Sequence, residues 1–371
     1  MADFRTTVTP DGIVFRFPDP GHAYDDVRLA FHLDLPGFSR HLDRVEGGWA
    51  VHWPLPPLDR VEYQFVARLP GRHDKPTFVT DPGNSHRIDA PFGAVSCLEL
   101  PGYQAPAWLA QEKVSGRHTP LAIPGTPIGD IEATLWAPEG TDAHEPLPLI
   151  VAQDGPEFDR LGGLTAAVAA FIAAGRMPAT RVALLTPIER NGDYSANPRY
   201  ADALAGDVVP AITAAFATRG RPILAGLSLG GLAALHTEWT HPGTAGGLLL
   251  LSGSFFLDAY DGHERGFPHW ARLRAFVDEV LESPYAGVTQ PDSARLPIAL
   301  GWGTGEENRH DNVVMTARLQ ALGFPTAVAT RRDGHVFTCW RDLLDPLLPE
   351  LAASAWPDPA ILDRAVDRAS A

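Results

Sequence analysis

Short apolar runs alternate with longer amphipathic stretches from about residue 115 onward, and this pattern constrains the fold more than any other feature of the chain. Each run has the length of a buried strand, and the stretches between runs carry apolar residues at spacings of three and four, as helices do. Such an alternation is typical of a mostly parallel sheet with helices on both faces. The predicted strands are Pro146–Ala152, Arg181–Leu185, Pro222–Ala225, Gly247–Leu251, Pro297–Leu300 and Thr326–Ala329, and the predicted helices are Asp202–Phe216, Leu229–Glu238, Trp270–Leu281 and Asn312–Leu322.

The first part of the chain follows a different pattern. Short alternating runs such as Val27–Leu33 and Val61–Arg68 are separated by turns rich in Pro and Gly, which is typical of a small β-sandwich. The segment Pro101–Trp108 fits neither pattern and is the best candidate for a linker. We therefore predict an all-β, immunoglobulin-like sandwich domain at 1–110 and an α/β domain at 111–371.

Composition and charge exclude several kinds of partner. The chain is 45% hydrophobic, and its formal net charge of −15 gives no general attraction to nucleic acid or to anionic membranes. The N-terminal stretch MADFRTTVTPDG lacks the basic start and apolar core of a secretory signal, so we expect a cytoplasmic protein. Leu164–Gly175 is too short to cross a bilayer and predicts a buried helix. Cys97 and Cys339 lie far apart in the sequence and are expected to be buried thiols in a reducing compartment.

The run Gly226-Leu227-Ser228-Leu229-Gly230-Gly231 contains a G-x-S-x-G pattern between a predicted strand and a predicted helix. In the α/β-hydrolase fold, this turn raises a serine hydroxyl to the top of the sheet. We predict that Ser228 is a nucleophile. The N–H of Leu229, at the start of the helix, is the expected donor to the oxyanion that forms during acyl transfer.

A second oxyanion donor in this fold comes from the loop after an early strand. Here that strand runs into Gln153-Asp154-Gly155-Pro156. A backbone N–H of Asp154 or Gly155 is the candidate, and an ordinary turn explains Asp-Gly-Pro equally well.

A hydrolase places its acid after the serine and its histidine last in the chain. His335 follows the last predicted strand and is the expected general base. Glu306 follows the strand before it and is the first choice for the carboxylate that orients the imidazole. Glu307 and Asp311 remain alternatives, as does a dyad without an acid.

Metal and nucleotide motifs are not supported. His236 and His241 flank Glu238 in a pattern that resembles a zinc site, but five positions place the histidines roughly 140° apart around a helix. The sequence has no P-loop, G-x-G-x-x-G or paired C-x-x-C motif. We expect neither a cofactor nor a metal.

Two segments give the chain a resemblance to the enterochelin esterase family, whose members hydrolyse iron-loaded catecholate siderophores and carry an N-terminal sandwich domain. They are the Gly226–Gly231 run and Gly334-His335-Val336-Phe337-Thr338-Cys339-Trp340-Arg341, which is close to the family's G-H-x-x-x-C-W-R block. Tyr63-Gln64-Phe65 with Thr80-Asp81-Pro82-Gly83-Asn84 also resembles the end of that sandwich domain. The resemblance implies an α/β-hydrolase esterase that acts on a ferric siderophore.

A further segment, Arg190-x-x-Asp193-x-x-x-Asn197, resembles the family's R-x-x-E-L-x-x-N pattern. It departs from that pattern at Asp193 and Tyr194, and Val336 stands where the family often has Asp. An iron–tris-catecholate is a trianion, which suits a pocket that holds cations and aromatic faces.

The candidates for substrate binding are Arg190, Trp302, Trp340 and Arg341. A cap for Arg341 and core packing for Trp340 are open alternatives. Two other functions also remain open: an esterase for another acyl, feruloyl or carbohydrate ester, and a ligand-binding protein without catalysis on a hydrolase scaffold.

Overall fold

The computed structural model describes residues 4–71, 75–283 and 296–357. Residues 1–3 of the N-terminal stretch therefore lie outside the described residues. The chain divides into two compact units. The first consists of Met1–Gln104 together with Gly303–Glu307 and Arg331–Cys339, and the second holds the remaining segments. The sequence predicted a single boundary near residue 110. It did not predict that Gly303–Glu307 and Arg331–Cys339, which come later in the chain, belong to the first unit.

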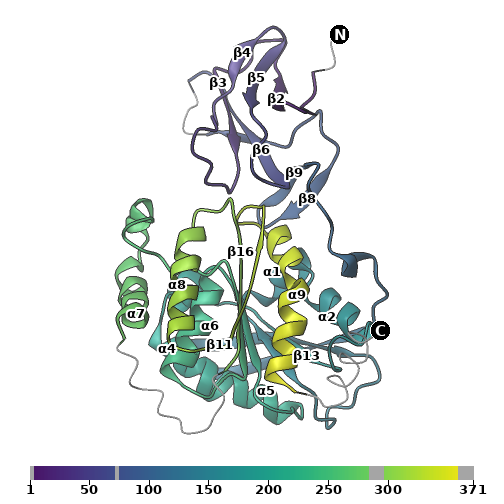
Figure 1. The fold of residues 1–371 in the computed structure, drawn as a ribbon, viewed down its shortest axis with the longest axis vertical. Helices are drawn as coiled ribbons and strands as arrows, with labels where there is room; N and C mark the ends of the chain where they lie inside the picture. Colours follow the sequence, from purple (N-terminus) through teal and green to yellow (C-terminus); the bar gives the residue numbers. More distant parts are fainter. Residues whose placement is uncertain (1–3, 72–74, 284–295, 358–371) are drawn as a thin grey trace. The chain divides into compact units, whose positions relative to one another are not determined.

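The first unit is built from antiparallel strands, drawn in purple and blue in Figure 1. One sheet has the order β1-β2-β5-β4, and the other has the order β3-β6-β9-β8 with β7 beside β6. The strands are β1 (Thr7–Thr9), β2 (Gly12–Pro18), β3 (Asp26–Ala30), β4 (Asp43–Val45), β5 (Gly48–Trp53), β6 (Arg60–Arg68), β7 (Thr77–Val79), β8 (Arg87–Ala90) and β9 (Gly93–Glu99). Buried aromatic rings fill the space between the sheets, with the ring of Phe15 at 4.9 Å from Trp53 and 5.0 Å from Tyr63. The predicted all-β domain is confirmed.

The second unit contains an eight-stranded sheet of order β10-β11-β13-β12-β14-β15-β16-β17. The neighbouring strands β13, β12, β14, β15 and β16 run parallel to one another. The hairpin β10–β11 adds an antiparallel edge. The strands are β10 (Gly116–Thr126), β11 (Gly129–Pro138), β12 (Leu149–Ala152), β13 (Arg181–Leu185), β14 (Ile223–Leu227), β15 (Gly247–Leu251), β16 (Ile298–Gly303) and β17 (Thr326–Arg331). β12 to β16 are buried along their whole length, which explains why they read as continuous apolar runs.

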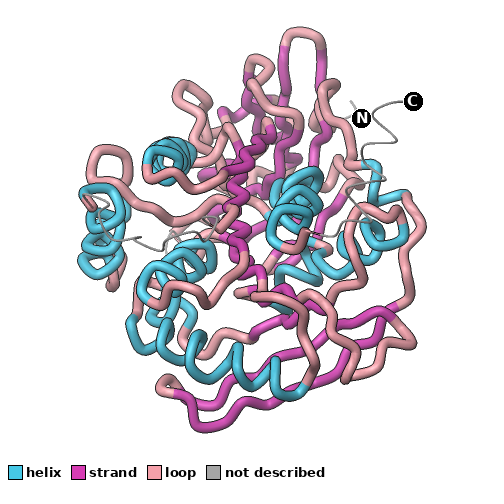
Figure 2. Tube along the Cα trace, turned by 60° about the horizontal axis from the view of Figure 1, so that its bottom comes forward, coloured by secondary structure: helices cyan, strands magenta, loops and turns pink. Residues whose placement is uncertain are grey.

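Helices lie on both sides of the central strands of this sheet, as Figure 2 shows in cyan and magenta. They are α1 (Gly155–Gly162), α2 (Leu164–Ala173), α3 (Arg190–Tyr194), α4 (Pro198–Ala203), α5 (Val209–Ala215), α6 (Leu229–Thr240), α7 (Trp270–Glu282), α8 (Arg309–Ala321) and α9 (Phe337–Ala355), with 3-10 turns at η1 (Ala107–Ala110) and η3 (Gly262–Gly266). The predicted buried helix at Leu164–Gly175 corresponds to α2. Among the described residues, no helix has the length and apolar character needed to span a membrane.

The predicted single helix at Asp202–Phe216 is interrupted. A π-helical turn, η2 (Leu204–Val208), separates α4 from α5. Pro210 lies near the start of α5, lacks an N–H and would crowd the carbonyl of Gly206 in a regular helix, so the preceding turn widens.

Candidate active site

Ser228 occupies a sharp turn between the end of β14 and the start of α6. Its φ of 53° and ψ of −121° lie in a region that residues with a side chain rarely adopt. The N–H of Ser228 donates to the carbonyl of Leu251 (2.9 Å), and the Ser228 carbonyl accepts from the N–H of Ser254 (3.1 Å). These hydrogen bonds hold the strained conformation in place.

The glycines of the turn allow the strand and the helix to approach each other. A Cβ added to Gly226 would lie 2.1 Å from the carbonyl oxygen of Gly230, and one added to Gly230 would lie 2.9 Å from Cβ of Gln153. Neither position therefore has room for a side chain. This close approach is the physical reason for the G-x-S-x-G spacing.

The two predicted oxyanion donors have different surroundings. Leu229 is the first residue of α6, and an α-helix leaves the N–H groups of its first turn without an intrahelical acceptor. The N–H of Asp154 instead donates to Oη of Tyr194 (3.1 Å). The prediction that this N–H donates to the oxyanion is therefore wrong. Gly155, the first residue of α1, remains the prediction for the second donor.

The side chain of Asp154 is bound by Arg190. Nε and one terminal nitrogen of Arg190 lie 2.8 and 2.7 Å from the two carboxylate oxygens of Asp154. Burial raises the pKa of Tyr194 beside this pair, and the negative charge of Asp154 adds to the shift. Arg190 was predicted to bind substrate. Its guanidinium instead makes both hydrogen bonds to Asp154 in the loop after β12, so its charge is already compensated by this carboxylate.

The loop after β15 contributes a contact that the sequence analysis missed. Oγ of Ser254, which is buried, lies 3.1 Å from Oγ of Ser228. The neighbouring Ser252 has a φ of 49°, and its carbonyl accepts a hydrogen bond from the side chain of Asn308 (3.1 Å). The available signal was position, since Ser252-Gly253-Ser254 directly follows the buried strand next to β14.

His335 and Glu306 lie together in the first unit. Nδ1 of His335 is 3.5 Å from Oε2 of Glu306, whose side chain is fully buried. Glu307 is exposed, and Asp311 lies in the first turn of α8. Glu306, the first choice from the sequence, therefore lies beside the imidazole.

Asp333, two residues before His335, has an unusual environment. Burial raises the pKa of its carboxyl to about 7, against the opposing effect of the Arg60 guanidinium. The pKa of His32 is lowered by burial and by the positive charges of His335 and Arg40, whereas Glu307 opposes that shift. No sequence pattern points to a role for Arg60, Asp333 or His32, because their proximity depends on contacts between distant parts of the chain.

Two of the remaining substrate-binding predictions, Trp302 and Trp340, require correction. Trp302 is only 6% exposed and belongs to the apolar core around the sheet. Trp340 is 5% exposed, and its indole N–H donates to Oγ of Ser252 (2.8 Å). Both rings are packed inside the protein and do not offer an aromatic face to a ligand. Arg341 pairs with its neighbour Asp342, with Nε 2.8 Å from Oδ1, and its role in substrate binding remains a prediction.

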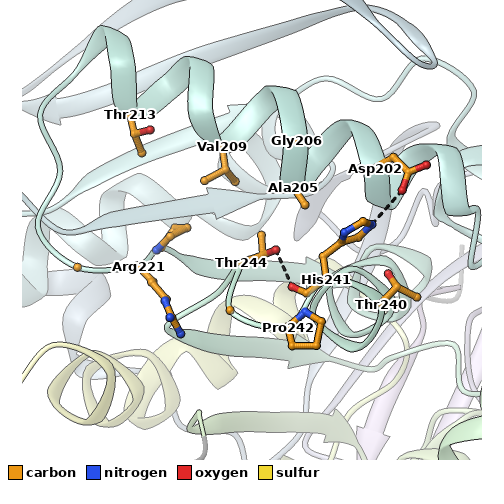
Figure 3. A pocket seen from close by; sticks show the side chains of 13 residues that line it. Asp202, Ala205, Gly206, Val209, Thr213, Arg221, Thr240, His241, Pro242 and Thr244 are labelled. Carbon is orange, nitrogen blue, oxygen red and sulfur yellow. Dashed lines mark hydrogen bonds and ion pairs between the residues drawn. The ribbon is translucent and has the colours of Figure 1, made fainter. Parts of the chain in front are cut away.

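An open pocket of about 760 Å³ lies in the second unit (Figure 3). Arg221 and Thr244, which line it, precede β14 and β15, whereas Ser228 follows β14. His241 and Asp202 also line it, with Nε2 of His241 2.9 Å from Oδ1 of Asp202. The pocket therefore has no part in chemistry at the elbow.

The zinc-like pattern is also explained by these contacts. His236 is buried with its ring 4.8 Å from that of Phe276, and the Glu238 carboxylate accepts from the N–H groups of Gly243 (2.8 Å) and Ala245 (2.7 Å). The side chains thus point to separate partners. Within residues 4–71, 75–283 and 296–357, no cluster of three or more His, Cys, Asp or Glu side chains could hold a metal ion.

Comparison with known proteins gives a family and a fold. Residues 127–351 match the model of the family described as "Putative esterase". An Iron(III) salmochelin esterase of Escherichia coli O6:H1 is 28% identical over 222 residues, which are 57% of this chain and 52% of that protein. The match therefore spans about half the length of this curated relative.

Crystal structures of similar fold cover nearly the whole chain. Ferric enterobactin esterase from Salmonella typhimurium superposes with a TM-score of 0.72 over 96% of this chain and 97% of its own, at 21% identity. The enterobactin esterase from Shigella flexneri, in the presence of enterobactin, gives a TM-score of 0.69 over 93% and 94%, at 20% identity. The predicted fold, an α/β-hydrolase domain preceded by a β domain, is confirmed.

Proposed function

The chain belongs to the family described as "Putative esterase", and from this premise we propose that it is a serine esterase with Ser228 as nucleophile, His335 as general base and Glu306 as the acid that orients the imidazole. The strained turn of Ser228 at the N-terminus of α6 carries this proposal. A residue with a side chain occupies this conformation only where the surroundings enforce it, and such positions concentrate at active sites. The 3.5 Å approach of Glu306 to Nδ1 of His335 supports the other two roles.

The proposed reaction is acyl transfer to the serine. His335 takes the proton of Ser228, and Oγ attacks the ester carbonyl. The N–H groups of Leu229 and Gly155 donate to the developing oxyanion. His335 then returns the proton to the alcohol that leaves, and water hydrolyses the acyl-enzyme by the same steps. Glu306 holds the imidazole in the required tautomer and stabilises its charged form.

An iron-loaded catecholate siderophore is the proposed substrate, and release of its iron inside the cell is the proposed purpose. The salmochelin esterase match and the Gly334–Arg341 segment support this substrate class. Iron would enter as part of the substrate, so the proposal needs no resident metal. Cytoplasmic location remains a prediction.

A hydrolysis panel tests both levels of the proposal. It compares iron-loaded and iron-free trilactone siderophores with aryl and feruloyl esters, using the wild type and Ser228→Ala. We expect the highest kcat/KM for a siderophore, and a loss of about 10³-fold or more in Ser228→Ala, because the nucleophile is removed. Undiminished hydrolysis by a folded Ser228→Ala would contradict the mechanism. Hydrolysis of aryl or feruloyl esters alone would contradict the siderophore substrate.

Labelling with a fluorophosphonate separates the esterase from a ligand-binding protein without catalysis. The probe should modify Ser228 in the wild type, as peptide mass spectrometry can verify. Ser354→Ala, an exposed serine on α9, is the matched control and should label like the wild type. Absence of labelling would favour the binding protein.

A further inference from the structure

A buried ion pair within the first unit connects the sandwich to the segment that carries His335. Arg60 is the first residue of β6, and Asp333 lies two positions before His335. The Arg60 guanidinium donates to Oδ2 of Asp333, and the two side chains are 1% and 6% exposed. The pair thus joins positions that are 273 residues apart in the sequence.

Each partner of the pair is held by a second contact. Oδ1 of Asp333 accepts the N–H of Gly334 (2.8 Å), and Gly334 directly precedes His335. The Arg60 guanidinium lies 4.8 Å from the ring centroid of Tyr103. The orientation of the carboxylate therefore determines the orientation of the peptide that leads into the histidine.

Backbone hydrogen bonds attach the same segment to the sandwich on both sides of the pair. The N–H of His335 donates to the carbonyl of His32 (3.1 Å), and the Arg332 carbonyl accepts from the N–H of Asp59 (2.6 Å). A Cβ added to Gly334 would lie 2.5 Å from the His32 carbonyl oxygen, so the two backbones are in close contact.

The loop that carries Glu306 is attached to the same region. The carbonyl of Gly305 accepts from the N–H of Asp34 (2.8 Å), and the N–H of Gly305 donates to the carbonyl of Asp333 (2.9 Å). The two loops are therefore bonded to each other and to adjacent residues of the sandwich. This arrangement defines the distance between Glu306 and His335.

A buried ion pair contributes little net stability to a fold. Removing two charges from water costs free energy, and well-packed apolar side chains often stabilise a protein as well or better. What a charged, hydrogen-bonded pair adds is direction, because its donor and acceptor must align. The Arg60–Asp333 pair is therefore better explained by the geometry it imposes than by stability.

We infer that Arg60 and Asp333 are positioning residues that hold His335 in register with Glu306, an inference that rests on the proposed esterase function. Neither side chain touches substrate in this role. Their loss should lower turnover because a misplacement of about 1 Å can cost around 10²-fold in rate. Substrate affinity should change little.

The test uses the full chain and the ester that the wild type hydrolyses fastest in the panel above. The double variant Arg60→Leu/Asp333→Leu removes both charges and leaves neither one buried alone, so it should retain a cooperative thermal transition. We expect its kcat to fall by about 10- to 100-fold with KM within about 3-fold of the wild type. Arg60→Lys keeps the charge without the guanidinium fork and should recover part of kcat.

The matched control is Asp26→Leu/Arg68→Leu, which removes an ion pair (3.0 Å) from the other end of β6. Its kcat and KM should stay within about twofold, since most partly exposed pairs contribute little. A folded Arg60→Leu/Asp333→Leu with kcat within twofold of the wild type would overturn the inference, as would an equal loss in the control.

If the double variant does not fold, Arg60→Lys decides, and an unchanged kcat in that variant would also overturn the inference. Ser228→Ala distinguishes the two proposals. Loss of activity in Ser228→Ala with full activity in the Arg60 variants leaves the esterase standing and removes only the positioning role.

Discussion

Ser228 and His335 are held in place by different means. The turn around Ser228 is shaped by glycines within two positions of it and by hydrogen bonds to the loop after the neighbouring strand. The segment around His335 is instead held by a buried ion pair to Arg60, 273 residues earlier in the chain, and by backbone hydrogen bonds to other residues of the sandwich. The first depends on close packing of backbone, and the second on polar contacts between distant segments.

This difference predicts different responses to substitution. Close backbone packing tolerates no added atom, so the elbow should fail abruptly when a methyl group is introduced. In a polar network each substitution removes only one or two contacts. Substitutions around His335 should therefore lower activity by smaller amounts. Substitutions in the two regions test this contrast.

Gly226→Ala should abolish activity or prevent folding, because its Cβ would lie 2.1 Å from the Gly230 carbonyl oxygen. Ester hydrolysis should fall by about 10³-fold or more, as expected when the serine and its oxyanion donors lose their geometry together. Gly206→Ala is the control, since a Cβ there meets no atom within 4 Å. A fully active Gly226→Ala would show that the elbow is not sterically determined.

Glu306→Gln should lower kcat by roughly 10²- to 10⁴-fold while the fold is retained, because the amide no longer stabilises the charged imidazole or enforces its tautomer. Steady-state kinetics and thermal unfolding measure the two quantities. The neighbouring Glu307 is exposed, and Glu307→Gln should stay within about threefold of the wild type. The reverse result would assign the acid to Glu307.

Ser254→Ala should lower kcat by about 3- to 10-fold, since one hydrogen bond of roughly 1 kcal/mol to Oγ of Ser228 is lost. The rate of fluorophosphonate labelling should fall in parallel. Because Ser254 belongs to the loop that supports the elbow, a loss as large as that of Gly226→Ala would mean that this hydroxyl, rather than the glycines, determines the turn.

The pH dependence of stability should have opposite signs in the two regions. Burial lowers the pKa of His236, on the helix that follows Ser228, to about 4. The unfolded chain takes up this proton near pH 6.5, so the stability contributed by neutral His236 is present above that pH and is lost as the pH falls toward 4. The lowering of the His236 pKa from 6.5 to about 4 corresponds to about 3 kcal/mol of unfolding free energy.

Asp333 has the opposite sign, because its pKa is raised to about 7 from 3.8. Its contribution is present below pH 3.8 and is lost as the pH rises through 7, because above that pH the buried carboxyl is ionised and its pairing with Arg60 does not fully offset the desolvation of its charge. In chemical denaturation at several pH values, His236→Gln should reduce the loss of stability toward acid, and Asp333→Asn should reduce the loss between pH 4 and 7. Each variant is the control for the other, and identical pH profiles would contradict both assignments.

Several features could be predicted from the sequence because their causes are local. The strands β12 to β16 lie in a sheet covered on both faces, so each appears as an uninterrupted apolar run. The elbow appears as G-x-S-x-G because its glycines contact each other and the adjacent strand. Chain order was enough to select His335 from the other histidines for the proposed base.

Other features depend on tertiary contacts that the linear sequence does not show. The linear pattern made Glu306 the first choice but left Glu307 and Asp311 as alternatives. The folded loop brings Glu306 to 3.5 Å from the imidazole. Trp302 and Trp340 had the right residue type for a binding surface, but packing buries both rings.

Arg60 and Asp333 carry no motif at all. Local periodicity records which face of a strand or helix is buried, whereas the pairing of two charges 273 residues apart depends on how whole elements pack. Local patterns were therefore enough to predict the fold class and the candidate nucleophile, whereas the position of Glu306 beside His335 and the contacts that hold this pair depend on how distant segments pack.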